Sequence, residues 1–305
     1  MSLPAVEQGT LRLRLPATSA NLGPGFDAAA IALDFALHIE AMPSEAFSID
    51  ATGRNADRCG QLNDNLILVL YRRLLEQNDR PLVPLSIRMC NEIPLGMGCG
   101  SSAAGRLAAI LLANHFGRLN WSSERILEEV TLFEGHPDNA AACWLGGFVA
   151  AACIGRSVHV ARVEPPADWR AIVVLPPAPL ATSKARAILP VSYSRADSVA
   201  NVQSAALLGL AFAQTRADLL AIAMRDRIHQ PYRESICPML PRLLPLSGVG
   251  PVLGVALSGA GPSVLAFVAS EADVPAASQA ILGALDGLPE PELLVSRLSA
   301  SGANR

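Results

Sequence analysis

The sequence of 305 residues lacks the signals of several common protein classes. It has no run of basic residues and no zinc-finger spacing, and its formal net charge is −3. A protein that binds nucleic acid neutralises phosphates with clustered Lys and Arg side chains, so we expect no nucleic-acid partner. Residues 1–10 lack the basic end and the apolar stretch of a signal peptide. We therefore expect a cytoplasmic protein.

Closely spaced cysteine pairs are also missing. The chain has six cysteines, and none of them forms a CxxC pair. They are Cys59, Cys90, Cys99, Cys143, Cys153 and Cys237. In a chain of this length, such scattered positions predict reduced thiols in the core rather than a disulfide framework.

Two long stretches lack charge altogether, which raises the question of a membrane span. Residues 247–270 are uncharged and numerous enough to cross a bilayer. Five glycines and two prolines interrupt them, so we predict two strands joined by a glycine-rich loop. Residues 139–155 are also uncharged, but they are too few and are broken by Gly146 and Gly147. We expect both stretches in the core and no membrane partner.

Short patterns along the chain predict alternating strands and helices. Strands are expected at 10–15, 85–90 and 171–175, and helices at 65–78, 102–116, 123–133, 197–214, 217–229 and 274–285. The segment 163–170 is rich in Pro and polar residues, as linkers are. We therefore predict an α+β protein of two domains, 1–165 and 166–305, with a cleft between them.

The segment PLGMGCGSSAAG, residues 94–105, carries the most chemistry. Gly96, Gly98 and Gly100 stand at alternate positions and let the backbone approach a ligand without Cβ obstruction. Ser101 and Ser102 then begin a helix whose free N–H groups and positive dipole end attract phosphate. The segment is neither a Walker A loop nor a GxGxxG loop. Its spacing favours phosphate binding slightly over a tight turn that packs an alanine-rich helix.

Five further segments accompany this one and carry a family resemblance. In chain order, the six are PATSANLGPGFD (16–27), PLGMGCGSSAAG (94–105), EGHPDNAAA (134–142), ATSKAR (181–186), HQPYR (229–233) and LSGAGPSVLAF (257–267). Together they resemble the motifs of the homoserine kinases, a family of the GHMP kinase superfamily. The resemblance implies phosphorylation of the side-chain hydroxyl of L-homoserine by ATP, a step of threonine biosynthesis. It also implies the two-domain GHMP fold, with an N-terminal domain like the second domain of ribosomal protein S5 and a ferredoxin-like C-terminal domain.

The resemblance further implies which residues bind ATP and Mg²⁺. The nucleotide phosphates would lie against a loop of Pro94, Leu95, Gly96, Met97, Gly98, Cys99, Gly100, Ser101, Ser102, Ala103 and Ala104. Mg²⁺, which prefers hard oxygen ligands, would be held by Glu134 and the hydroxyl of Ser102, with Ser101 as a weaker alternative. Asn65 either faces the adenine or is only the N-cap of a helix.

The remaining motif residues match the two charged ends of a free amino acid. Arg186 and Arg233 would bind the carboxylate, since the Arg fork contacts both oxygens, and Thr182 would add a hydrogen bond. Asp27 and Asn21 would accept from the ammonium group, with His136 near the mouth of the site. Asn139 would orient the hydroxyl rather than act as a base, because a loose phosphoryl-transfer transition state needs little base assistance. We expect Asn139, Glu134 and Arg186 to be the catalytic residues.

Two other functions remain open from the sequence. The chain could be a GHMP kinase for another small alcohol, such as a mevalonate-type intermediate or a sugar, but these lack the ammonium group that Asp27 and Asn21 would bind. It could also be a GHMP-fold sensor without turnover, although Glu134, Arg186 and the complete loop at 94–104 argue against this. Apart from its function, the family resemblance also leads us to expect a possible homodimer.

Overall fold

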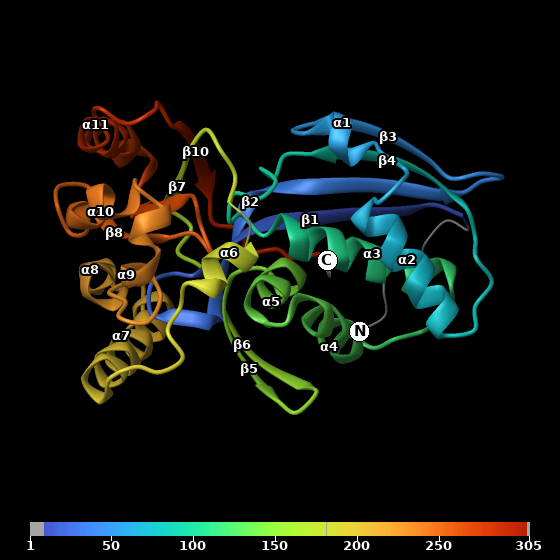
Figure 1. Ribbon diagram of the computed structural model, residues 1–305, viewed down its shortest axis with the longest axis horizontal. Helices are drawn as coiled ribbons and strands as arrows, with labels where there is room; N and C mark the ends of the chain where they lie inside the picture. The colour runs from blue at the N-terminus through green and yellow to red at the C-terminus, as the bar shows by residue number, and fades with distance from the viewer. Residues whose placement is uncertain (1–8, 181, 304–305) are drawn as a thin grey trace.

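The computed structural model describes residues 9–180 and 182–303, without the side chains of Thr182 and Ser183. In this part of the chain, the strands form two sheets that are joined by helices and loops (Figure 1). The strands of the first sheet come from residues before the predicted linker, and those of the second sheet come after it. No helix among the described residues is long and apolar enough to cross a membrane.

The first sheet has six strands in the order β3-β4-β2-β5-β6, with β1 paired to β2. They are β1 (Leu11–Asn21), β2 (Gly25–Pro43), β3 (Ser48–Gly53), β4 (Leu85–Asn91), β5 (Phe148–Ile154) and β6 (Ser157–Val163). All pairs are antiparallel except β3 with β4. The predicted strands at 10–15 and 85–90 are confirmed, and the first extends to Asn21.

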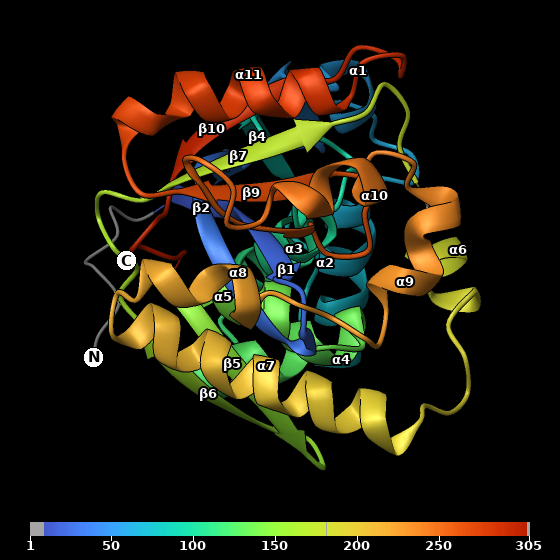
Figure 2. The same ribbon diagram turned by 90° about the vertical axis from the view of Figure 1, so that its left-hand side faces the viewer.

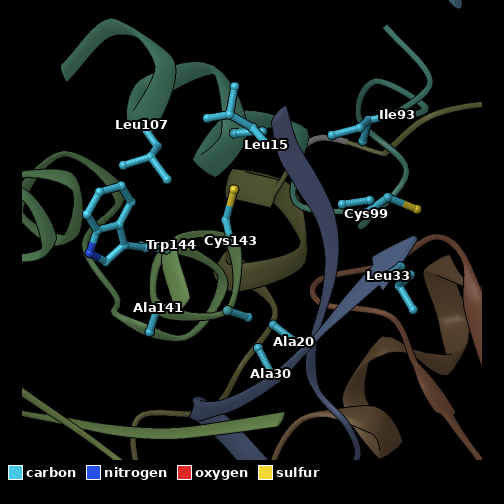
Figure 3. Close-up of a cluster of buried hydrophobic side chains, with 14 of the residues drawn as sticks. Leu15, Ala20, Ala30, Leu33, Ile93, Cys99, Leu107, Ala141, Cys143 and Trp144 are labelled. Atoms are coloured by element: carbon cyan, nitrogen blue, oxygen red, sulfur yellow. The ribbon is translucent and has the colours of Figure 1, made fainter. Parts of the chain in front are cut away.

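Among the described residues, four helices of this half bury side chains in the core beside the sheet, and a fifth, at Ala56–Cys59, has no buried residue. They are α1 (Ala56–Cys59), α2 (Leu66–Gln77), α3 (Ser101–Phe116), α4 (Ser123–Glu134) and α5 (Asp138–Leu145). The alanine-rich α3 contacts α2, α4, α5 and β1, and most of its residues are buried. Its small side chains let these neighbours approach closely. Figure 3 shows side chains of α3, α5 and β1 gathered in this core, among them Leu107, Trp144 and Leu15.

The second sheet is antiparallel, with the order β10-β7-β9-β8. Its strands are β7 (Arg170–Leu175), β8 (Val252–Leu257), β9 (Val264–Val268) and β10 (Glu292–Arg297). In chain order this arrangement is 4-1-3-2, with helices after the first and third strands, which is the ferredoxin-like pattern. The predicted fold class is therefore confirmed, as is the strand–loop–strand interpretation of residues 247–270.

The helices of this half are α6 (Thr182–Ala187), α7 (Arg195–Ala213), α8 (Leu220–Ala223), α9 (Gln230–Arg233), α10 (Leu240–Leu243) and α11 (Val274–Ala284). Among them, α8 and α10 contact β8 and α11 contacts β7, whereas α7 packs along α8 (Figure 2). Short 3-10 turns lie at η1 (Ala217–Leu219), η2 (Glu234–Ile236), η3 (Leu244–Leu246) and η4 (Glu271–Asp273).

The predicted helix at 217–229 is wrong in its second half. The chain leaves α8 after Ala223, and the carboxylate of Asp226 accepts hydrogen bonds from the backbone N–H groups of Ile228, His229 and Gln230. An Asp side chain that satisfies backbone donors in this way favours a turn over a continuous helix. The turn carries His229 and α9 toward the first sheet.

One hydrophobic cluster spans both sheets, and a second cluster joins the second sheet to α10 and α11. Phe212 of α7 stacks on Phe148 of β5 with ring centroids 4.4 Å apart, and it also contacts Trp169 and Phe267. The aromatic rings thus bind the halves of the chain to each other by a continuous apolar contact. Of the predicted linker, residues 164–169 lie between β6 and β7, and the division into domains at 165 stays a prediction.

Candidate functional site

The loop before α3 requires glycine for two separate reasons. Gly96, Gly98 and Gly100 have φ values of 70°, 77° and 72°, in the left-handed region that other residues avoid. A Cβ on Gly98 would lie 2.1 Å from the carbonyl oxygen of Ser258, and one on Gly100 would lie 1.9 Å from Oγ1 of Thr18. The loop is therefore fixed between β1 and the turn after β8.

Ser258 joins three of the recognised segments. Its hydroxyl donates to the carbonyl oxygen of Gly98 at 2.8 Å and lies 2.8 Å from the hydroxyl of Ser19. The backbone N–H of Gly259 donates to the carbonyl oxygen of Ala20 at 3.0 Å. The loop at 94–100 thus has a rigid backing made by residues far apart in the sequence.

The first turn of α3 faces the cleft and is suited to bind an anion. Gly100 is its N-cap, and no described side chain caps the N–H groups of this 16-residue helix. Unpaired N–H groups and the positive end of the helix dipole attract negative charge. Gly100, Ser101, Ser102 and Ala103 all line the cleft.

Ser102 and Glu134 meet at the end of this turn. The hydroxyl of Ser102 donates to Oε1 of Glu134 at 2.9 Å, although the two residues belong to different helices. Arg106, one turn further along α3, donates from its Nη1 atom to the hydroxyl oxygen of Ser102 and to Oε1 of Glu134. The side chain of Glu134 is only 6% exposed. A carboxylate and a hydroxyl that converge in this way are oxygen donors of the kind that Mg²⁺ prefers.

A second group of charges lies further along the same cleft. Arg186 of α6 forms a bidentate ion pair with Asp27, with Nη2–Oδ1 and Nη1–Oδ2 distances of 2.5 and 3.0 Å. Hydrogen bonding by Asp27 raises the pKa of Arg186 above its usual value. Asn21 accepts from the backbone N–H of Asp27 at 3.0 Å and donates to the carbonyl oxygen of Gly259 at 2.7 Å. Asn21 therefore fixes the turn that presents Asp27.

Arg233 lies beside this ion pair and is almost fully buried. Its guanidinium donates to the carbonyl oxygen of Ala185 and to Nδ1 of His229, each at 3.0 Å. His229 donates from Nε2 to the carbonyl oxygen of Gly23 at 2.8 Å, and burial lowers the pKa of this imidazole. A neutral His229 satisfies both contacts. Arg233 therefore lies in the cleft in one fixed orientation.

Phe26 supports both arginines. The guanidinium carbon of Arg186 and that of Arg233 each lie 5.5 Å from the centroid of its ring. A cation over an aromatic face is stabilised by the ring quadrupole. Phe26 belongs to the first recognised segment, yet its role was missed because a lone Phe in a sequence is indistinguishable from a core residue.

Asp138 organises a group of polar side chains beside Asp27. It is buried, and its Oδ1 atom accepts from Nδ1 of His136 at 2.6 Å and from the backbone N–H of Asn139 at 2.7 Å. Burial opposes protonation of His136, but the hydrogen bond and charge of Asp138 outweigh it, so the pKa of His136 is raised. Asn139 in turn accepts from the hydroxyl of Thr18 at 2.7 Å through Oδ1. Its amide nitrogen donates one N–H to Oδ1 of Asp138 at 3.4 Å, which leaves the second N–H as a donor.

These groups line one continuous cleft of about 800 Å³. Most predicted site residues are among those that line it: Asn21, Asp27, Asn65, Leu95, Gly96, Gly98, Gly100, Ser101, Ser102, Ala103, Glu134, His136, Asn139, Arg186 and Arg233. Pro94, Met97, Cys99 and Ala104 are not among the residues that line it. Burial raises the pKa of the Cys99 thiol to about 12. The side chain of Thr182, at the start of α6, lies outside the described part of the structure.

Asn65 is the N-cap of a helix and also lines the cleft. Its Oδ1 atom accepts from the backbone N–H groups of Ile67 and Leu68, which makes it the N-cap of α2. Its residue also lines the cleft. Capping is confirmed, and contact with a base stays a prediction.

Comparisons with known proteins place these features in a family. The model of the GHMP kinases N terminal domain matches residues 65–147, and that of the GHMP kinases C terminal domain matches residues 210–286. A homoserine kinase of Solibacter usitatus is 44% identical over 256 residues, which cover 84% of each chain. One of Deinococcus radiodurans is 38% identical over 255 residues, which cover 84% of this chain and 83% of that protein.

Solved structures show the same fold over nearly the whole chain. The crystal structure of homoserine kinase from Cytophaga hutchinsonii has a TM-score of 0.83 at 24% identity and covers 99% of this chain and 98% of that one. A mevalonate kinase from L. major, solved with R-mevalonate, has a TM-score of 0.70 at 16% identity, with 98% and 100% covered. At these identities the likeness concerns the fold alone.

Proposed function

Because the chain belongs to the GHMP kinases and, among them, to the homoserine kinases, we propose that it transfers the γ-phosphoryl group of ATP to the side-chain hydroxyl of L-homoserine. The products are ADP and O-phospho-L-homoserine. The observation that carries the substrate assignment is the ion pair of Asp27 and Arg186 beside Arg233. These residues line the same cleft as the glycine loop. An anion site and a site for a zwitterion thus share one cavity.

The nucleotide phosphates bind where the glycine loop meets the first turn of α3. The left-handed glycines let the backbone come close, and the N–H groups of Ser101, Ser102 and Ala103 point to the cleft side of the helix start. Nothing in this arrangement requires a side-chain base. It works by position and by charge, as phosphoryl transfer requires.

Ser102 and Glu134 would hold Mg²⁺. The support is the hydroxyl of Ser102 and the carboxylate of Glu134, two oxygen donors in contact at 2.9 Å, with Glu134 shielded from solvent and Arg106 beside both. When bound, the ion neutralises charge on the transferring phosphoryl group. Ser101 also lines the cleft, but Ser102 is the serine that contacts Glu134.

The amino-acid end of the substrate binds at the second group of charges. The ammonium group binds Asp27, and the carboxylate binds Arg186 and Arg233, whose planar forks match its two oxygens. Asp27, His136 and Asp138 lie together within 4.8 Å, so this group favours a cation. The burial of Arg233 makes its charge more effective than it would be in water.

Asn139 positions the hydroxyl that receives the phosphoryl group. Its Oδ1 atom is engaged by Thr18 and one N–H of its amide by Asp138. The second N–H is the donor that binds the hydroxyl oxygen, and it takes no proton from it. Asp138 is buried and already accepts from His136 and from the backbone. These contacts support positioning by Asn139 rather than general-base catalysis.

ADP release from MgATP tests the proposal, with L-homoserine, L-serine, L-threonine, mevalonate and galactose as acceptors. We expect turnover with L-homoserine to exceed that with each other acceptor. Turnover only with mevalonate or galactose would contradict the roles of Asp27, Arg186 and Arg233. Binding of ATP without any turnover would favour a sensor, the remaining alternative.

Two properties of the whole protein belong to the same proposal. We propose a cytoplasmic location, supported by six free cysteines among the described residues.

We also propose a homodimer, supported by exposed apolar side chains on α7, among them Val199, Val202 and Leu210. Sedimentation equilibrium should give about twice the chain mass of 32.0 kDa. A single-chain mass would contradict the dimer.

A further inference from the structure

Arg106 has a place in the site that none of the recognised motifs explains. It lies on α3 one turn after Ser102, and its guanidinium contacts the hydroxyl of Ser102 at 2.9 Å and also Oε1 of Glu134. These two oxygens are the ones assigned above to the metal. A guanidinium therefore holds the two metal ligands in the free enzyme.

The burial of Glu134 explains why a cation is needed there. Its side chain is 6% exposed, and the contacts described for its carboxylate are those with Ser102 and Arg106. A buried carboxylate without a compensating cation is strongly disfavoured. Arg106 supplies that cation and also keeps the ends of α3 and α4 in register.

The same contact opposes binding of a metal ion. Mg²⁺ carries two positive charges, and it cannot share Oε1 of Glu134 with a guanidinium without strong repulsion at short range. Arg106 must turn away when the metal enters. Its side chain is 27% exposed and lines the cleft, so it has room to turn toward the region where the nucleotide phosphates bind.

We propose that Arg106 is a resident counter-ion of the metal site, which keeps free divalent cations out until a nucleotide arrives. The phosphates then offer the guanidinium a new anionic partner, and Ser102 and Glu134 become available to the metal. This inference rests on the proposed metal site. It makes binding of metal and nucleotide positively coupled, so the metal binds mainly as part of the nucleotide complex.

Mn²⁺ binding to the nucleotide-free enzyme tests this role. Free Mn²⁺ is measured by electron paramagnetic resonance for the wild type and for Arg106→Met, Arg106→Gln, Glu134→Gln and the double variant Arg106→Met/Glu134→Gln. We expect Mn²⁺ to bind both Arg106 variants about 10-fold tighter than the wild type, the scale on which groups beside metal ligands change metal affinity. The gain should disappear in the double variant.

A matched control comes from the next helix. Arg125 of α4 forms an ion pair with Glu129 in the same helix, and neither residue lines the cleft. Arg125→Met removes a guanidinium from a carboxylate without touching the metal site. We expect its Mn²⁺ affinity to equal that of the wild type.

Thermal unfolding covers the case in which the Arg106 variants are less stable. Mn²⁺ should raise the melting temperature of Arg106→Met more than that of the wild type, because the ion replaces the lost cation at Glu134. Equal or weaker Mn²⁺ binding in both Arg106 variants would overturn the proposal, as would a gain that survives in the double variant. Turnover of L-homoserine by the wild type is measured separately. An absence of that turnover would contradict the proposed function, whereas the role of Arg106 is decided by the Mn²⁺ comparison.

Discussion

At the scale of single residues, the site is built from side chains whose polar atoms are already partly used. Asn139 has its carbonyl oxygen engaged by Thr18, and Arg233 has one edge of its guanidinium engaged by His229 and the backbone. What remains of each group has one orientation and one hydrogen-bonding role. Fixed orientation of donors is what phosphoryl transfer needs.

Removal of the Asn139 amide should therefore affect turnover more than nucleotide binding. We expect Asn139→Ala to lower kcat by about 100-fold, the scale on which loss of orientation acts. ATP affinity, measured by calorimetry, should stay within about twofold, because the described hydrogen bonds of the Asn139 side chain go to Thr18 and Asp138 and none goes to the glycine loop. Near-normal kcat would show that Asn139 does not position the hydroxyl.

The pair of His136 and Asp138 should make stability depend on pH. The pKa of His136 is raised in the folded state. The pair therefore stabilises the protein fully at pH values below the unfolded pKa of His, about 6.5. This stabilisation is lost as the pH rises through the folded-state pKa of His136. We expect His136→Gln to cost more stability in urea unfolding at pH 6 than at pH 9. His159 is exposed, and His159→Gln should show no such difference. Equal costs at both pH values for His136→Gln would contradict the assignment.

At the scale of elements, the glycine loop and α3 form one unit whose backbone is fixed by sterics. Gly100 combines a positive φ with a Cβ position that overlaps the Thr18 hydroxyl. Gly209 in α7 is the opposite case, since a Cβ there meets nothing within 4 Å. The two glycines provide a matched pair of substitutions.

Gly100→Ala should destabilise the protein and weaken ATP binding. Strain at a left-handed position costs about 1–3 kcal/mol, and relief of that strain requires the loop to leave its place beside β1. Gly209→Ala should instead raise the free energy of unfolding by about 0.5–1 kcal/mol, because Ala is the better helix former. Urea unfolding and nucleotide titration of both variants test this pair. Normal ATP affinity in Gly100→Ala would show that the loop conformation is dispensable.

The elements differ in how well the sequence predicts them. The helix α3 has alanines, a glycine loop before it and Gly117 after it, and its prediction was nearly correct. The strand β2 was missed because its segment GFDAAAIALDFALHIEAMP is rich in alanine and buried through much of its length. Such a strand shows no alternation, and its conformation comes from pairing with β1, β4 and β5.

The site was predicted through the motifs, and what escaped prediction depends on tertiary packing. Arg106 looks like any arginine on a helix surface until the end of α4 is placed against it. His229 was read as part of a helix, whereas the turn at Asp226 carries it to Gly23 and Arg233. No local pattern encodes such contacts, because they join segments that are distant in the chain.

At the scale of the whole molecule, the shared core implies that both sheets unfold together. Phe212 packs on Phe148 of the first sheet and on Phe267 of the second. We expect a single urea transition that is the same by tryptophan fluorescence and by far-UV circular dichroism. Phe212→Ala should lower the free energy of unfolding by about 3–5 kcal/mol. Two separate transitions in the wild type would mean that the halves are independent.

The ion pair between Asp27 and Arg186 has a consequence for selectivity. The pair holds one negative and one positive group in mutual contact, so an incoming molecule gains only by exchanging partners with both of them. An amphoteric molecule does this without loss, since each of its charges replaces the one it displaces. A ligand with a single charge pairs with either Asp27 or Arg186 and leaves the other one half-buried without its partner. An uncharged alcohol separates the two and provides no charge to replace their contact. Binding of such molecules is therefore disfavoured, because it would break the ion pair between Asp27 and Arg186.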